Sequence, residues 1–138
     1  MSKRKAYRPK PVHLPMMKES RDALAMQLHM RIETLILAPS IDSCNEVSKV
    51  LATMSYAGLD SVALDAASEA VNAIIDRWER VKRIGVSAQE AEILRQSAGR
   101  LDVLLPKIPV NVLKAARAMV HDNFEKLQGE CNDTATHA

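Results

Sequence analysis

Apolar residues recur with the period of about 3.6 residues that marks an α-helix in five successive segments of this chain, and proline or glycine separates each segment from the next. The segments predicted to be helical are residues 16–37, 40–57, 60–84, 87–105 and 109–128. Only 3% of the residues are aromatic, whereas a β-sandwich or barrel usually contains more aromatic and β-branched side chains. The sequence therefore predicts an all-α fold, a compact bundle of about five helices.

Residues at the ends of these segments favour the same boundaries. Ser40 can cap the second segment, and Ser87 with Glu90 forms a capping-box pattern that starts the fourth. Three glycines suit the left-handed position just past the second, third and fifth helices: Gly58, Gly85 and Gly129. The remaining glycine, Gly99, lies inside the fourth helix and opposite its apolar face, where it costs about 1 kcal/mol of helix stability relative to alanine.

The polar and small residues of the helices suggest how they are placed. Residues 60–84 have one narrow polar stripe and many alanines, so we expect this helix to run through the middle of the bundle. Cys44 lies on the apolar stripe of the second helix and is expected to be buried. On the fifth helix, a polar stripe is expected to face water; its members are Lys114, Arg117, His121 and Glu125.

The positive charge of the chain is concentrated at its N-terminus. The first ten residues contain five of the 19 Lys and Arg residues, and the other 14 compare with 17 acidic residues, so the rest of the chain is mildly acidic. Three prolines within residues 9–15 favour an extended backbone. We therefore divide the chain into a basic, Pro-rich arm (1–15), a helical bundle domain (16–129) and a flexible polar tail (130–138).

The arm has the clearest local mechanism for binding. Its candidate binding residues are Lys3, Arg4, Lys5, Tyr7, Arg8 and Lys10. The cations can neutralise phosphates and the tyrosine can stack on a base, so we predict contact with nucleic acid or with an acidic surface. The alternative is a solubilising tail that binds nothing. No helical segment has a dense Lys/Arg face, which disfavours a helix-turn-helix reader of DNA.

A second candidate surface lies on the first helix. Met26, Met30 and Leu37 fall together on nearly the opposite face from the main apolar stripe of this helix. Another helix of the same chain can cover them, which is the interpretation we favour. The alternative is a protein interface, including one with a second copy of the chain, because methionine suits adaptable contact surfaces.

The sequence has no pattern typical of a metal site, a cofactor site or an enzyme. The four histidines do not combine with cysteine, acids or one another at a metal-binding spacing, and His121 with Glu125 has the spacing of an ordinary surface pair. No stretch approaches the ~18 apolar residues of a membrane span, and no signal-peptide pattern is present. We therefore expect a cytoplasmic, non-enzymatic protein with no cofactor and no membrane partner.

The opening SKRKAYRPKPV, followed by an Ala- and Leu-rich helical body, resembles small helical proteins of proteobacterial genomes and their prophages. Their arm has the form KRK-x-YRP-[KR]-PV, which residues 3–12 match, and residues 74–85 are loosely similar. The resemblance implies a phage or mobile-element setting in a bacterial cytoplasm, and it carries over no functional residues. We expect an interaction protein whose helical body docks a host or phage macromolecule while the arm contacts nucleic acid or an acidic surface. A structural homo-oligomer is the second hypothesis, and an enzyme is the third.

Overall fold

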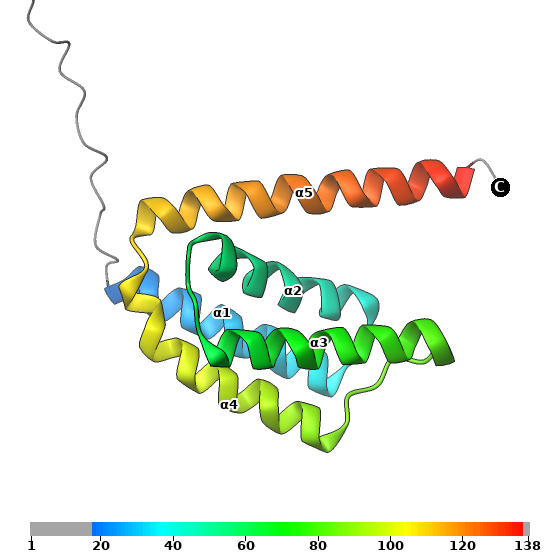
Figure 1. Cartoon of the computed structure of the whole chain (residues 1–138), viewed down its shortest axis with the longest axis horizontal. Helices are drawn as coiled ribbons and strands as arrows, with labels where there is room; N and C mark the ends of the chain where they lie inside the picture. The colour runs from blue at the N-terminus through cyan, green and yellow to red at the C-terminus, as the bar shows by residue number, and fades with distance from the viewer. Residues whose placement is uncertain (1–17, 137–138) are drawn as a thin grey trace, which may run out of the picture.

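The computed structural model describes the backbone of residues 18–136 and the side chains of residues 22–126, and this part of the chain folds into helices without strands (Figure 1). The elements are α1 (Lys18–Leu37), α2 (Ile41–Tyr56), α3 (Val62–Val81), α4 (Ala88–Leu104), the short 3₁₀ turn η1 (Leu105–Lys107) and α5 (Val110–Thr136). The predicted all-α class is confirmed. None of the helices described has the length and apolarity needed to cross a membrane.

Side-chain caps set two of the predicted helix starts. At the start of α2, the Ser43 backbone N–H donates a hydrogen bond to the Ser40 hydroxyl at 3.0 Å. At the start of α4, the Glu90 N–H donates to the Ser87 hydroxyl at 3.1 Å, and the Ser87 N–H donates to the Glu90 carboxylate at 2.9 Å. Each cap provides partners for backbone N–H groups that the first turn of a helix leaves unpaired. The predictions for Ser40 and for the capping box are confirmed.

The C-terminal ends of α2 and α3 differ in how they are made. Gly58 has a φ of +89° just past α2, as predicted. α3 ends at Val81, because Lys82 adopts the left-handed conformation with φ of 58° and donates its backbone N–H to the Trp78 carbonyl at 2.7 Å. The Lys82 ammonium also lies 5.3 Å from the centre of the Trp78 ring, a favourable contact in this conformation. The prediction that Gly85 ends the third helix is therefore wrong.

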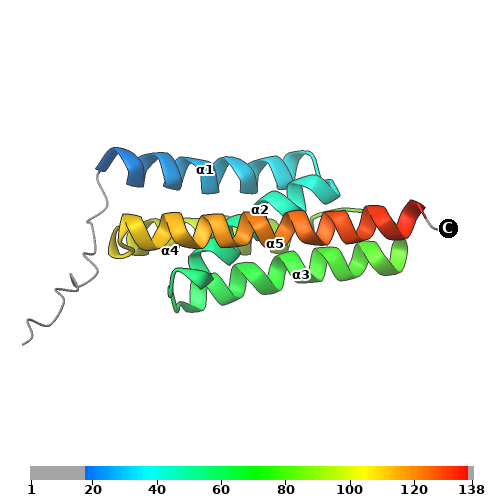
Figure 2. The ribbon, with the colours of Figure 1, turned by 90° about the horizontal axis from the view of Figure 1, so that it is seen from above.

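α2, and not α3, is the central helix of the bundle. It packs against α1, α3 and α5, whereas α3 packs against α2 and α4 (Figures 1 and 2). The expectation that residues 60–84 run through the middle is wrong, because the alanines of α3 permit close approach without adding a third neighbour. Cys44 on α2 is fully buried, as predicted, and burial raises the pKa of its thiol. The core is aliphatic; its largest fully buried side chains are Leu28, Ile32, Leu35, Met54, Ile74, Leu94, Leu101 and Leu105.

α5 has a single close neighbour among the described helices. It packs against α2 alone and lies along the bundle with α1 on one side and α3 on the other (Figure 2). Its buried side chains within residues 110–126 are Leu113, Ala116 and Val120. The helix continues past Gly129 to Thr136, so the prediction that this glycine ends it is wrong. A glycine inside a helix costs about 1 kcal/mol relative to alanine, which does not by itself stop the helix.

Candidate functional site

A groove of about 550 Å³ lies between α1, α2 and α5, and we call it the basic groove. Buried apolar side chains form its floor: Leu24, Val50, Met54, Leu113 and Val120. Basic side chains come from all three helices: Arg31 from α1, Lys49 from α2, and Lys114, Arg117 and His121 from α5. The other lining residues are Gln27, Glu46, Thr53 and Ala118.

Helical periodicity explains why these side chains gather there. On α5, Lys114, Arg117 and His121 are three and four residues apart, so they share one face of the helix. The sequence predicted that this stripe faces water. The three residues are exposed, and the structure adds that they line a groove whose other wall is α1. The signal available in the sequence was basic residues at a regular helical spacing, but nothing local indicated what stands opposite them.

The groove differs in charge from the rest of the helical body. Residues 22–126 contain 12 Lys and Arg residues and 14 Asp and Glu residues, which gives a formal charge of −2. The 14 residues that line the groove include four Lys and Arg residues and one Glu, which gives +3. Because cations concentrated in a concave site attract anionic ligands, this contrast marks the groove as a candidate binding site.

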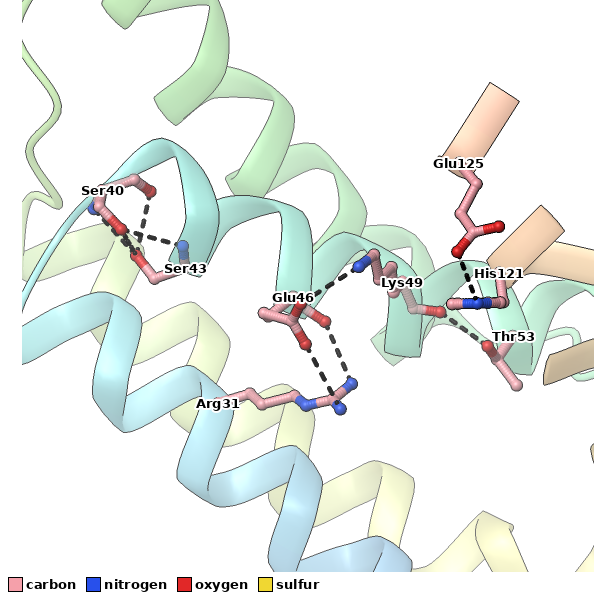
Figure 3. Close-up of polar contacts among 8 residues, drawn as sticks. All are labelled: Arg31, Ser40, Ser43, Glu46, Lys49, Thr53, His121 and Glu125. Carbon is pink, nitrogen blue, oxygen red and sulfur yellow. Dashed lines mark hydrogen bonds and ion pairs between the residues drawn. The ribbon is translucent and has the colours of Figure 1, made fainter. Parts of the chain in front are cut away.

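The cations of the groove are only partly neutralised within the described part of the chain. Glu46 pairs with both Arg31, at 3.4 Å, and Lys49, at 3.2 Å (Figure 3). Lys114 and Arg117 form no hydrogen bond or ion pair with the residues described. Lys114 and Arg117 of α5 therefore remain available for a ligand. Arg31 of α1 and Lys49 of α2 share the Glu46 carboxylate.

His121 Nε2 lies 3.1 Å from Glu125 Oε1, one turn further along α5, and both side chains are exposed (Figure 3). The predicted interpretation as an ordinary surface pair is confirmed. On the other side of α5 lies a second hollow of about 470 Å³, whose lining includes Tyr56, Phe124 and Val120. Val120 lines both hollows, so α5 rests on α2 along a narrow strip with an open space on each side.

The predicted binding residues of the arm, Lys3, Arg4, Lys5, Tyr7, Arg8 and Lys10, lie outside the described residues. The described chain begins with α1, whose first turn lies at the same end of the bundle as the first turn of α5 (Figures 1 and 2). The α5 residues of the groove come from the first half of that helix, and its α1 residues extend from Leu24 to Arg31, past the middle of α1. The arm precedes α1 at this end of the bundle, and the groove extends from near this end to the middle of α1 and α5.

The methionine stripe of α1 is exposed. Met26, Met30 and Leu37 have 63%, 61% and 77% of their surface accessible, and we call them the α1 outer surface. The favoured expectation that another helix covers them is wrong for the described part of the chain. The reason is that α2, α4 and η1 all pack against α1 from its other side, while α5 packs against α2. The alternative, an interface with another protein or a second copy, stays a prediction.

Two polar contacts between α1 and α4 escaped the sequence analysis. His29 Nε2 lies 2.6 Å from Asp102 Oδ2, and Arg95 donates two hydrogen bonds to the Glu33 carboxylate at 2.7 and 3.0 Å. The hydrogen bonds from Arg95 hold the pKa of Glu33 below its usual value. No group of three or more His, Cys, Asp or Glu side chains within residues 22–126 is arranged to hold a metal ion. These pairs therefore link helices, and no third ligand or nucleophile joins them among the contacts described.

No family model, curated protein or solved structure matches this chain. The candidate site is a concave, cationic groove with an apolar floor.

Proposed function

We propose that this protein is a small non-enzymatic interaction protein of a bacterial or phage-infected cytoplasm, whose helical body docks a macromolecule while its basic arm contacts nucleic acid or an acidic surface. The observation that carries the proposal is the charge of the basic groove, +3 over 14 lining residues in a body whose formal charge is −2. A protein stabilised only by packing has no need to gather unpaired cations over a buried apolar floor, whereas a binding site for an anionic partner does.

The point at which the arm joins α1 in the sequence supports the same proposal. Lys10 precedes the first residue of α1 by eight residues, and a chain of that length spans at most about 28 Å. The arm and the groove can therefore engage one partner, or two adjoining partners. Attachment of a second binding element raises its effective concentration at the partner, so two weak cationic contacts can combine into a stronger one.

The arm is tested by fluorescence anisotropy on single- and double-stranded oligonucleotides over a series of salt concentrations. With up to five arm cations engaged, we expect the slope of log affinity against log salt to be about −3 to −5. Deletion of residues 1–12 should flatten the slope and leave the thermal midpoint of unfolding almost unchanged, because these residues precede α1. Binding should be nearly indifferent to base sequence, since a short arm contacts phosphates more readily than base edges.

The matched control keeps the length and the prolines of the arm and replaces only its five Lys and Arg residues with glutamine. It should behave like the deletion if charge is responsible. Absence of oligonucleotide binding by the full chain even at low salt would contradict the nucleic-acid role of the arm, which would then contact an acidic protein surface or bind nothing.

A structural homo-oligomer is the second candidate function. The observation that favours it is the α1 outer surface, which exposes three large apolar side chains on the face of α1 directed away from the core. Its test is the molar mass in solution of the wild type and of Met26→Glu with Met30→Glu.

A further inference from the structure

We infer that the basic groove is a docking site for an acidic amphipathic helix of a protein partner. This inference rests on the proposed function, whose macromolecular partner it identifies by chemical class. Charge complementarity, the aliphatic floor and the packing of α5 against α2 alone point to this occupant.

The floor of the groove requires an apolar ligand surface. Leu24, Val50 and Met54 present buried aliphatic groups, and α5 adds Leu113 and Val120. The described lining contains no Phe, Tyr or Trp, and the His121 imidazole is its single aromatic ring, so the groove lacks the row of stacking platforms with which proteins bind the bases of single strands. Nucleic acid has no aliphatic side chains to place on such a floor. A protein segment with Leu, Ile or Met on one face does.

The rim of the groove requires negative charge beside those apolar groups. Arg31 on the α1 wall and Lys114 and Arg117 on the α5 wall stand on opposite sides of the floor. Glu46 partly neutralises Arg31, whereas Lys114 and Arg117 have no partner among the described residues. A ligand that carries carboxylates on both flanks of an apolar stripe would satisfy this arrangement.

The shape of the groove favours a helix over a small molecule. α1 and α5 each pack against α2 but not closely against each other, so the groove is open between them. Pockets for small ligands usually enclose most of the ligand, whereas an amphipathic helix inserts side chains from one face and leaves the other in solvent. A volume of about 550 Å³ accommodates a few large apolar side chains, not a whole helix. A helix seated there would also give α5 a second neighbour.

A second copy of this chain is not the favoured occupant. Among the described residues, α3 is the helix with the most exposed acidic side chains, which are Asp65, Glu69, Asp76 and Glu79. The apolar face of α3 is buried against α2 and α4, so α3 could enter a neighbour's groove only by leaving its own bundle.

The test uses the full chain and a fluorescein-labelled synthetic helix of about 18 residues, with leucine at the i, i+3, i+4 and i+7 positions and glutamate on both flanks. A basic twin replaces every glutamate with lysine.

The groove variant of the protein is Lys114→Glu with Arg117→Glu. The matched control is Arg80→Glu with Arg83→Glu, which makes the same charge change at two exposed positions, one in α3 and one just past its C-terminal end. A steric variant, Ala118→Trp, fills the groove from an exposed lining position. Circular dichroism confirms that each variant folds.

We expect the acidic helix to bind the wild type and the α3 control within about threefold of each other, and the groove variant at least about tenfold more weakly. The basic twin should prefer the groove variant over the wild type. Ala118→Trp should also weaken binding of the acidic helix by at least about fivefold, because the apolar stripe can no longer reach the floor. Deletion of residues 1–12 should leave this binding within about threefold.

Several results would overturn the inference: no binding of the acidic helix at low salt, equal losses in the groove variant and the α3 control, or unchanged binding by Ala118→Trp. Displacement of the helix by an oligonucleotide whose affinity depends on Lys114 and Arg117 would assign the groove to nucleic acid and overturn it as well. If the helix fails to bind while arm-dependent oligonucleotide binding persists, the inference is wrong and the proposed function stands. If arm-dependent oligonucleotide binding fails while the acidic helix binds the groove, the inference stands and the nucleic-acid role of the arm is wrong.

Discussion

Glu90 shows how a single side chain can serve two helices of this bundle. One carboxylate oxygen accepts the Ser87 N–H at the start of α4, and the other pairs with Arg77 of α3 at 2.5 Å. Arg77 also donates to the Gly85 carbonyl at 3.2 Å, inside the connection between the two helices. Because Glu90 is buried, loss of Arg77 would leave an uncompensated charge there, which costs far more than loss of an exposed pair.

Gly99 offers a test of stability at the scale of one residue. It lies inside α4, and a Cβ atom added there would meet nothing within 4 Å. Gly99→Ala should therefore raise the free energy of unfolding by about 1 kcal/mol, through helix propensity alone. For a domain of this size that corresponds to a rise of roughly 3–6 °C in the thermal midpoint. Thermal melts followed by circular dichroism at 222 nm measure it.

Gly58→Ala is the matched control for that substitution. The added Cβ again meets no neighbour, but the φ of +89° is a conformation that alanine adopts only with strain. The same chemical change should therefore lower stability by about 1–2 kcal/mol. If Gly99→Ala is instead less stable than the wild type, this face of α4 is not open in solution. A partner protein or a second copy that covered this face would have that effect.

The sequence predicted the side-chain contacts that join residues close together along the chain. The caps at Ser40 and Ser87 could be predicted because donor and acceptor are three residues apart. The pairs between α1 and α4 could not, because 73 residues separate His29 from Asp102 and 62 separate Glu33 from Arg95. Their contacts exist only once the packing of α1 on α4 is known, and periodicity does not specify which helices become neighbours.

The same limit applies at the scale of the helices. Periodicity identified five helices and most of the buried side chains on each, because the side-chain direction repeats with the helix turn. Met119 of α5 was expected to be buried and is exposed. It could not tell how many neighbours a helix has. The Ala-rich helix α3 was expected at the centre, whereas α2 holds that place. Equally, the second apolar stripe of α1 has the same pattern whether a helix, a partner protein or solvent faces it, so its exposure could not be predicted.

The α1 outer surface gives a prediction for the helix as a unit. If it mediates self-association, Met26→Glu with Met30→Glu should lower the molar mass measured by multi-angle light scattering to that of one chain, while helicity persists. Both positions are more than half exposed, so the substitutions should change the stability of the monomer by no more than about 0.5 kcal/mol each.

Lys114→Glu with Arg117→Glu is the matched comparison, since it adds the same two acids on α5. It should leave the molar mass as in the wild type. A wild-type protein that is monomeric at tens of micromolar would exclude the homo-oligomer, and the α1 outer surface would then be available only to another protein.

At the scale of the whole molecule, charge and packing are distributed unevenly, and the two distributions coincide at α5. α1, α2, α3 and α4 form most of one aliphatic core, to which α5 adds Leu113; α5 packs closely against α2 alone among the described helices and carries three of the five basic side chains of the groove. The element that bears most of the candidate binding groups is therefore the one with the least support from the rest of the fold. Binding elements are commonly drawn from such regions, because they can adjust at low cost in free energy.

This arrangement predicts a hierarchy of local stability that hydrogen exchange can measure. Amides of residues 114–126 in α5 should exchange at least about tenfold faster than those of residues 44–54 in α2, because α5 can open by losing contacts with one helix, whereas α2 opens only with the whole bundle. Val120→Ala, which shortens a buried contact between α5 and α2, should accelerate exchange in α5 alone. Ile74→Val, in the shared core, should accelerate exchange in all five helices by lowering the global free energy of unfolding.

Addition of the acidic helix should slow exchange in α5 more than in α3, since a ligand in the groove gives α5 its second neighbour. Equal protection of α5 and α2 in the free protein would show that α5 has support beyond α2, and the groove could then not be the open, weakly held site inferred from the packing.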